Sequence, residues 1–283
     1  MKVRVLCRRW WTLLAFLALA ALIAGCGGVG TGGTGGFTAS ISGKVADGYL
    51  VNATVFLDKN GNYQWDAGEP LTTTDINGGY KLDVDPADVG NYPIVAMAIK
   101  GVTIDKDTNQ TVANSYLLSM PKESVSGTAG NNFISPLTSQ LRELMETGKY
   151  STMQQATDDL RANMGLPIGT DITADYIAAN NTDMHAVAQN MATLMGNQMD
   201  QVFGTSGSTI TVDVNRYRGM MGTIFSNMPS IMGSNVQTGM FNINNTMSTV
   251  LPNVPQTRMG QPYQNMSSAF RGMLGGMNTR TNW

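Results

Sequence analysis

Oxygen-bearing side chains recur at fixed intervals in one short segment of the chain, from residue 58 to residue 69. They occupy positions 1, 3, 5, 9 and 12 of a twelve-residue loop: Asp58, Asn60, Asn62, Asp66 and Glu69. Position 7, Gln64, can offer its backbone carbonyl. Calcium binds six to eight oxygens at ~2.3–2.6 Å, and a glutamate at position 12 can supply two of them. These six residues therefore predict a metal site with Ca²⁺ as the cofactor.

Two features of this segment depart from an EF-hand. Position 6, where glycine is usual, is Tyr63, although Gly61 at position 4 can relieve the turn. The residues before the loop, 55–57, are typical of a strand where an EF-hand has a helix. We therefore expect an EF-like loop on a β scaffold. The alternative is a surface turn rich in Asp, Asn and Gly that binds no ion.

The N-terminus carries a second chemical signal. A basic stretch precedes an apolar run over residues 10–24, which is the layout of a secretory signal and is short for a stable membrane span. The junction Leu22-Ile23-Ala24-Gly25-Cys26 resembles the bacterial lipobox. The resemblance implies that residues 1–25 are a lipoprotein signal peptide and that Cys26 is lipidated. The alternative is an uncleaved membrane anchor with a buried Cys26.

Residues 26–37 follow the proposed cleavage site and include seven glycines between positions 27 and 36. Such a segment has few side chains with which to build a core, so it predicts a flexible tether. Residue 27 is Gly and not the Asp that, in enteric bacteria, retains lipoproteins at the inner membrane. We therefore expect an outer-membrane lipoprotein in the cell envelope, on either its periplasmic or its surface face.

Composition excludes several function classes. The chain has 283 residues, of which 13% are charged, with two Cys and one His. The charged fraction is near half the usual ~25%, which argues against a nucleic-acid binder. Two cysteines cannot form a Cys-rich zinc site, and a single histidine leaves little for His-based catalysis. Removing four basic signal-peptide residues from the total of 18 leaves 14 against 20 acidic residues, a net charge of −6. We expect a non-enzyme.

Three further groups of residues suggest a metal or catalytic site, but each also has an ordinary structural explanation. Met191, Met195 and Met199 share one helical stripe, and thioethers select Cu(I) or Ag(I), but such a stripe is more often core. His185 is the only base for a Ser-His-Asp device, yet its place in the first turn of a helix favours a solvated surface imidazole. Asp158 and Asp159 could pass for a catalytic pair, but adjacent helical side chains point about 100° apart.

Residues 38–122 have the pattern of an antiparallel β-sandwich. Alternating or apolar runs cover 38–46, 53–57, 79–84, 92–99 and 113–118. Gly, Asn and Asp lie between several of these short runs, as is typical of turns.

The order of motifs in this region resembles a known family. Gly43-Lys-Val-Ala-Asp47-Gly precedes the acidic loop, and Thr73-Thr-Asp75-Ile-Asn-Gly78-Gly-Tyr80 follows it. Together they resemble the Sdr-B and Cna-B repeat domains of bacterial surface adhesins and the related carboxypeptidase-regulatory-like sandwiches, over about residues 40–85. The resemblance implies a β-sandwich whose Asp/Asn/Glu loop binds calcium.

From residue 130 the hydrophobic period becomes helical. Ser135-Pro136 predicts a helix start, Ser151 with Gln154 a capping box, and residues 183–203 a third, longer helix. We therefore expect an α+β multidomain protein, in which the N-terminal antiparallel β-sandwich is followed by an all-α helical region over 130–204. This block resembles the helical segment that follows such sandwiches in large secreted or lipid-anchored proteobacterial proteins, and no activity comes with that resemblance.

Residues 205–283 are a Met- and Asn-rich basic tail. No Asp or Glu follows Asp213, and the five arginines after it give that part of the tail a local charge of +5. We expect one helix near 214–228 and another near 263–274. The chain between these two helices is expected to be loose. Such a tail could lie on anionic lipid or polysaccharide, or simply fold against the helices.

Together these features predict a lipid-anchored, adhesin-like binding or structural protein of the envelope, stabilised by calcium and without chemistry of its own. Its expected partners are the membrane, through the N-terminal lipid, and an envelope polysaccharide or protein, with no nucleic acid. The alternative is a periplasmic accessory lipoprotein that handles Cu or Ag through its methionines or assists a hydrolase.

Overall fold

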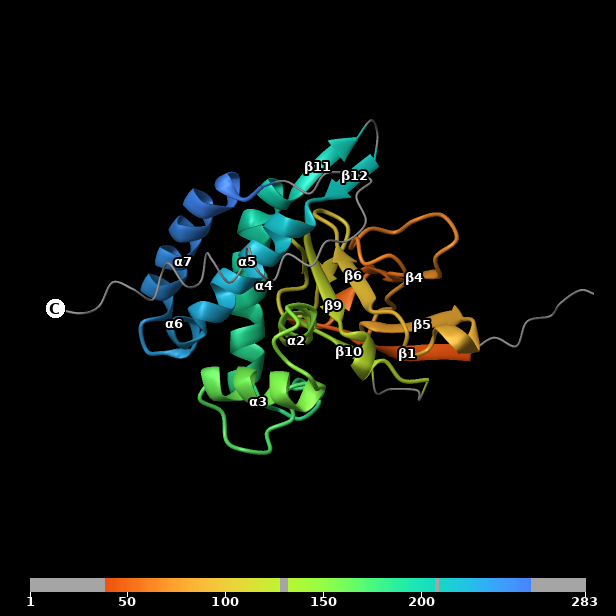
Figure 1. The fold of residues 1–283 in the computed structure, drawn as a ribbon, viewed down its shortest axis with the longest axis horizontal. Helices are drawn as coiled ribbons and strands as arrows, with labels where there is room; N and C mark the ends of the chain where they lie inside the picture. Colours follow the sequence, from red (N-terminus) through yellow and green to blue (C-terminus); the bar gives the residue numbers. More distant parts are fainter. Residues whose placement is uncertain (1–38, 128–131, 207–208, 256–283) are drawn as a thin grey trace, which may run out of the picture. The chain divides into compact units, whose positions relative to one another are not determined.

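The computed structural model describes residues 39–127, 132–206 and 209–255, which form the strands and helices of an α+β protein (Figure 1). The chain divides into two compact units between residues 37 and 38, and all described residues lie in the second unit. The predicted signal peptide, Cys26 and the tether lie outside the described residues. None of the helices in the described ranges is long and apolar enough to span a membrane.

Two sheets contain most of the strands. The first has the order β10-β1-β5 and the second the order β4-β3-β6-β9. Their bounds are β1 (Ala39–Val45), β3 (Thr54–Leu57), β4 (Leu71–Thr73), β5 (Gly79–Val84), β6 (Ile94–Ala98), β9 (Tyr116–Met120) and β10 (Asn132–Ile134). The five strands expected from the sequence correspond to β1, β3, β5, β6 and β9. Alternation explains β5, in which Tyr80, Leu82 and Val84 are buried between exposed or half-buried neighbours.

The first sheet departs from the predicted antiparallel pattern. Strand β1 pairs antiparallel with β5 but parallel with β10, which comes from the region expected to be all-helical. Asn132 at the start of β10 is fully buried, and its Nδ2 donates to the carbonyls of Ser42 (2.9 Å) and Ser126 (2.8 Å). These contacts hold β10 against β1, because a buried amide must find hydrogen-bond partners.

Shorter elements complete the β region. A small sheet contains β2 (Leu50–Val51), β7 (Ile104–Asp105) and β8 (Gln110–Thr111), and the single-turn helices are η1 (Pro86–Asp88), η2 (Lys122–Ser124) and η3 (Leu251–Asn253).

The helix starts follow local capping. Helix α2 (Pro136–Glu146) begins as predicted, since Ser135 caps it and exchanges hydrogen bonds with Thr138. The capping box expected at Ser151 is wrong by one residue. Helix α3 (Met153–Asn163) is capped by Thr152, whose hydroxyl accepts from the backbone N–H of Gln155. Helix α4 (Thr182–Val202) matches the third predicted helix to within one residue at each end.

The chain beyond α4 is more ordered than the sequence suggested. Its elements are the hairpin β11 (Phe203–Ser206) and β12 (Thr209–Val212), then α5 (Val214–Ser226), α6 (Met228–Met232) and α7 (Val236–Val250). Helix α5 was expected, but the loose chain expected after it is wrong. Helix α7 is poor in strong helix formers and is stabilised by tertiary contacts: Ile243 and Met247 are buried, and the Nε2 of Gln198 on α4 donates to Asn244 (2.6 Å). The helix predicted at 263–274 lies outside the described residues.

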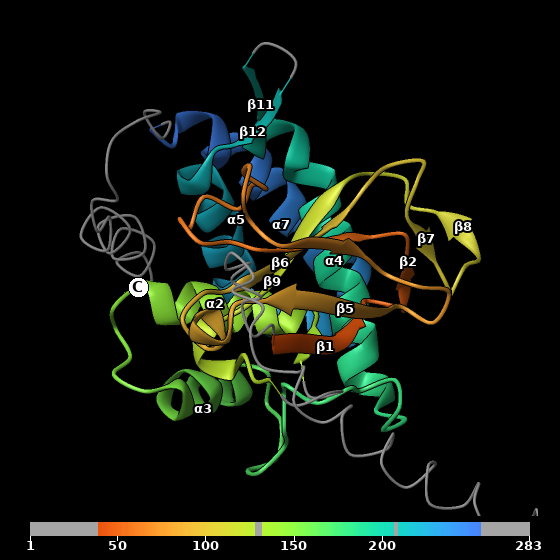
Figure 2. The same ribbon diagram turned by 90° about the vertical axis from the view of Figure 1, so that its right-hand side faces the viewer.

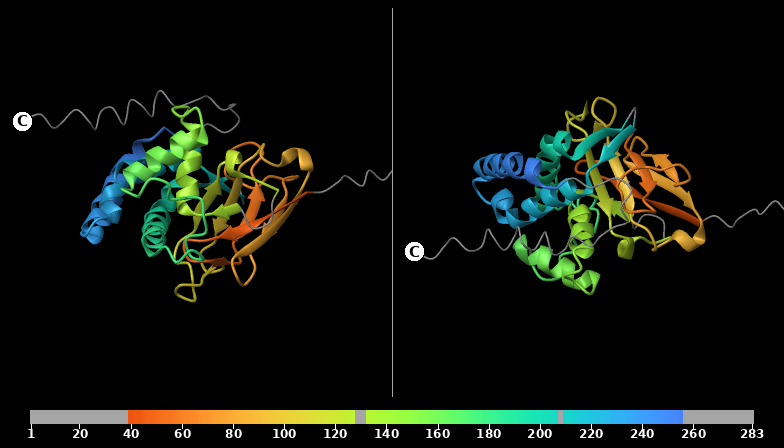
Figure 3. Two further views of the ribbon diagram at one scale, coloured as in Figure 1. Left: turned by 90° about the horizontal axis from the view of Figure 1, so that it is seen from below. Right: turned by 45° about the horizontal axis from the view of Figure 1, so that its top comes forward.

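The strands and the larger helices lie on opposite sides of this unit, with α2 between them (Figures 1, 2 and 3). Strand β9 packs on α2 from the sheet side, and α4 and α5 pack on it from the other. Every residue of α2 from Pro136 to Leu144 is therefore buried. A helix of this kind brings any polar side chain it carries into the interior.

Candidate functional site

The acidic loop connects β3 to β4 and is anchored by Asp58, whose side chain is fully buried. Its Oδ1 accepts the backbone N–H groups of Gly61 (2.9 Å) and Asn62 (3.1 Å). Its Oδ2 accepts the N–H of Tyr63 (3.2 Å) and Nη2 of Arg142 (2.8 Å). A carboxylate has about four acceptor sites, so protein donors occupy all those of Asp58.

The loop backbone adopts the turns that an EF-like loop requires. Asn60 Oδ1 accepts the N–H of Asn62 (3.1 Å), and Asn62 Oδ1 accepts that of Gln64 (2.8 Å). Gly61 and Tyr63 have positive φ angles of 76° and 62°. The left-handed conformation usual for glycine at position 6 is therefore taken by a tyrosine, at a strain of about 1–2 kcal/mol.

Asp66 and Glu69 close the loop. Asp66 Oδ2 accepts the Nδ2 groups of Asn60 and Asn62, both at 2.7 Å. The two oxygens of Glu69 accept the N–H groups of Lys59 (2.7 Å) and Asp66 (2.9 Å). Partial burial raises the pKa of Glu69, and the carboxylates of Asp58 and Asp66 add to the rise while these two backbone hydrogen bonds oppose it. Repulsion between the carboxylates therefore persists in the loop.

The loop fits a cation in part. In residues 39–127, 132–206 and 209–255, no three His, Cys, Asp or Glu side chains are grouped so as to hold a metal. In this loop, backbone N–H groups and Arg142 already donate to both oxygens of Asp58. Asn60, Asn62, Asp66 and Glu69 are exposed or half-buried and are hard oxygen ligands of the kind calcium takes.

Beneath the loop, Tyr63 and Arg142 join it to α2. Both side chains are buried, and the Arg142 guanidinium lies 3.8 Å from the centre of the Tyr63 ring. The Tyr63 ring also packs against Tyr217 of α5 at 4.7 Å, and its hydroxyl donates to Glu143 Oε1. Burial raises the pKa of Tyr63 well above its usual value, so the phenol keeps its proton. This packing offsets the backbone strain at Tyr63.

A buried charge network continues from α2 to α5. Arg142 Nε donates to Glu146 Oε1 (2.8 Å), and Arg218 of α5 pairs with Glu146 Oε2 and lies 3.6 Å from Glu143 Oε2. Burial and then the charge of Glu146 raise the pKa of Glu143. Although burial opposes it, the two arginines lower the pKa of Glu146. The network ties the loop, α2 and α5 into one electrostatic unit.

Sequence reasoning missed this network. Arg142 lies about 100–160° around α2 from the apolar stripe of Leu137, Leu141 and Leu144, so periodicity alone does not indicate that this arginine is buried. The one available signal was the sequence Arg142-Glu143 with Glu146 one turn later, which is also ordinary on an exposed helix.

A second polar cluster lies where the small sheet meets α4. The solvated surface imidazole expected at His185 is only partly exposed, at 24%: its Nε2 lies 2.7 Å from Asp107 Oδ2, and its ring stacks on Tyr176. The reason is that the turn between β7 and β8 packs on α4, where Gln189 also donates to Asp107 (2.7 Å). Nearby, the buried Asp47 accepts the hydroxyl of Tyr116 (2.7 Å).

The remaining site hypotheses involve residues that the structure places elsewhere. Met191, Met195 and Met199 are all buried in the core between α4 and its neighbours, as expected for packing. Asp158 pairs with Arg161, whereas Asp159 pairs with Lys149. The two carboxylates are therefore directed at different partners.

Comparison with known proteins gives no family for this arrangement: no family model, no curated protein and no solved structure matches the chain.

Proposed function

We propose that this chain is a lipid-anchored, non-catalytic protein of the cell envelope, with an adhesin-like binding or structural role and a loop that calcium stiffens. Its two larger sheets are proposed to act as a sandwich that carries the loop, with the helices as an attached module. The observation that carries the calcium part is the EF-like backbone of the loop, including the left-handed Tyr63 at position 6. The proposed partners are the membrane, through lipid on Cys26, and an envelope polysaccharide or protein.

The proposed calcium ligands are on the solvent side of the loop. Asn60, Asn62, Asp66 and Glu69 would hold the ion, and Gln64 would add its backbone carbonyl. When bound, the ion supplies positive charge beside Glu69, whose pKa the carboxylates of Asp58 and Asp66 otherwise help to raise. Asp58 holds the loop backbone in place through its donors, including Arg142.

Calcium is expected to raise the thermal stability of the described unit. Extracellular calcium modules bind at about 10⁻⁴–10⁻³ M, and a calcium concentration ten times the dissociation constant adds about 1.4 kcal/mol. For a unit of this size, that corresponds to a rise in Tm of about 3–6 °C. Thermal unfolding followed by circular dichroism, in millimolar calcium and in chelator, measures the shift.

Two carboxylate-to-amide variants separate the loop from general charge effects. Glu69→Gln should abolish most of the calcium-dependent shift, because it removes a charge and the proposed bidentate ligand. Glu123→Gln removes an exposed carboxylate of η2 and should leave the shift intact. Magnesium should do little, since it prefers a tight octahedral shell. A wild-type melting curve that is the same in calcium and in chelator would contradict the proposal.

Anchoring is expected to depend on one residue. Cys26→Ser should abolish lipidation and leave the precursor uncleaved, because the thiol is the acceptor of the lipid. Detergent partitioning and the mass of the mature N-terminus test this. An unmodified Cys26 in the mature wild-type protein would refute the anchor.

A further inference from the structure

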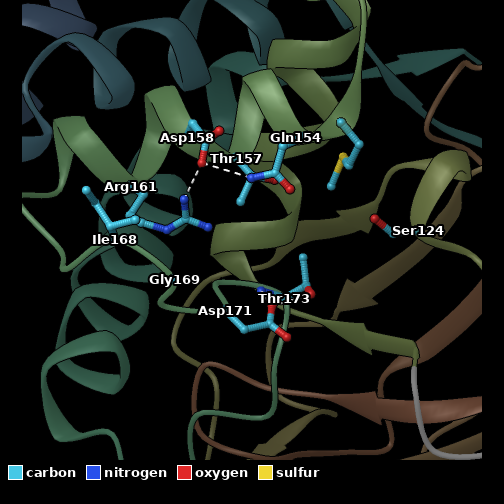
Figure 4. Close-up of a pocket in the computed structure, with 10 residues that line it drawn as sticks. Ser124, Gln154, Thr157, Asp158, Arg161, Ile168, Gly169, Asp171 and Thr173 are labelled. Carbon is cyan, nitrogen blue, oxygen red and sulfur yellow. Dashed lines mark hydrogen bonds and ion pairs between the residues drawn. The ribbon is translucent and has the colours of Figure 1, made fainter.

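A hollow of about 610 Å³ lies beside α3 (Figure 4). Five of the ten lining residues belong to α3, four to the segment 168–173, and one, Ser124, to η2. Neither the calcium loop nor the network beneath it lines this hollow. It is therefore a separate feature of the molecule.

Arg161 on α3 is fixed in the wall of the hollow. Its side chain is only 10% exposed, its Nε donates to the carbonyl of Thr170 (2.9 Å), and its Nη1 pairs with Asp158. Within the described part of the chain, its Nη2 has no hydrogen-bond acceptor. The hydrogen bonds of Nε and Nη1 thus fix the orientation of the planar guanidinium and leave Nη2 for a ligand. The donor is therefore pre-organised.

The acceptors around this donor are also held in place. Asp158 Oδ1 accepts from Gln154 Nε2 (2.9 Å) as well as from Arg161. Asp171 Oδ1 accepts both the N–H (2.9 Å) and the hydroxyl (2.6 Å) of Thr173. The second oxygen of each aspartate receives no donor from the described residues. Hydrogen bonds from Gln154 and Arg161 hold the pKa of Asp158 below its usual value, so this carboxylate remains ionised.

The charges of the hollow select the class of ligand. One guanidinium stands against two carboxylates, so the hollow repels a phosphate or a polyanion. A neutral ligand that fits donates hydrogen bonds to the carboxylates and accepts others from Arg161. Vicinal hydroxyl groups of a sugar do both. The fully exposed Ile168 and the half-buried Met153 add apolar surface for the C–H face of a sugar ring.

We propose that this hollow binds a neutral oligosaccharide. The inference rests on the binding role proposed above, because it names the ligand class and assigns it a site. Arg161 and Asp158 recognise hydroxyl groups, and Ile168 packs against the ring. The surface is distinct from the calcium loop, so saccharide binding and the calcium response are independent properties.

Calorimetric titration of the mature full chain with maltohexaose, cellohexaose and chitohexaose tests the proposal. At least one should bind saturably. Asp158→Asn and Ile168→Asp should each weaken that binding about tenfold or more, the range expected when a hydrogen bond to a charged group or an apolar contact is lost. Asp83→Asn, which alters an exposed carboxylate on β5, should not change it. Because Ile168 is fully exposed, its variant tests the site even if changes near Arg161 disturb folding.

Several results would overturn the proposal. One is no saturable binding of any of the three oligosaccharides, and another is binding that neither variant affects. Preferential binding of dextran sulfate or of oligolysine would show instead that the hollow selects charge. If lipidation and the calcium shift remain intact while oligosaccharide binding fails, the saccharide site alone is wrong. If they fail as well, the proposed function falls with it.

Discussion

Replacing Arg142 with methionine is expected to lower the free energy of unfolding by about 3–5 kcal/mol. Arg142 is 1% exposed and its partner Asp58 is fully buried. Removing the guanidinium leaves Asp58 as a buried carboxylate without its counter-charge, and it also removes the cation over the Tyr63 ring. Urea unfolding of Arg142→Met and wild type at pH 7 measures the difference.

Matched variants identify the source of the loss. Lys149→Met breaks the ion pair with Asp159, in which the lysine is 61% exposed, and should lower stability by no more than about 1 kcal/mol. Adding Asp58→Asn to Arg142→Met should restore part of the loss, since the amide still accepts backbone hydrogen bonds and carries no charge. If Arg142→Met costs no more than Lys149→Met, the pair does not anchor the loop.

Stability is expected to fall as pH rises from about 4 to about 7, and Asp47→Asn should remove the part of this dependence that Asp47 causes, leaving the part due to the raised pKa of Glu143. Burial raises the pKa of Asp47 to about 7; the hydrogen bond from Tyr116 opposes this, and the charges of Asp105 and Asp107 add to it. The folded state therefore keeps a proton that the unfolded chain has already lost. The shift corresponds to a loss on the order of 4 kcal/mol across this range.

Urea unfolding at pH 5 and pH 8 measures this effect. The free energy of unfolding of the wild type should be lower at pH 8 than at pH 5, and in Asp47→Asn this difference should be smaller, because only Glu143 still contributes to it. Asp200→Asn, an exposed residue of α4, serves as the matched control and should retain the wild-type slope. Equal slopes for wild type and Asp47→Asn would show that Asp47 titrates normally.

Much of the secondary structure follows from local sequence. The helix start at Ser135-Pro136 depends on a capping serine and the proline directly after it, so it is visible without any tertiary contact. Strand β6 lies in a long apolar run and β3 in a short alternating one, and both were expected for that reason. The turns at Asn60 and Asn62 are likewise local, because each side chain bonds a backbone group two residues on.

Other features depend on contacts that no local pattern contains. Helix α7 has weak intrinsic propensity and forms where Ile243 and Met247 find a partner surface. The parallel pairing of β10 with β1 joins residues about ninety positions apart. The partner of His185 is Asp107, on a turn far away in the chain.

The acidic loop shows where the two kinds of information meet. By itself, the sequence determined the spacing of its oxygens and its position after a strand, because both are properties of consecutive residues. Only the tertiary structure decided that Asp58 faces Arg142 and that Tyr63 takes a left-handed conformation. The physical reason is burial: β9 covers one side of α2 and two helices cover the other, so Arg142 becomes a buried cation that carboxylates of the loop (Asp58) and of its own helix (Glu146) balance.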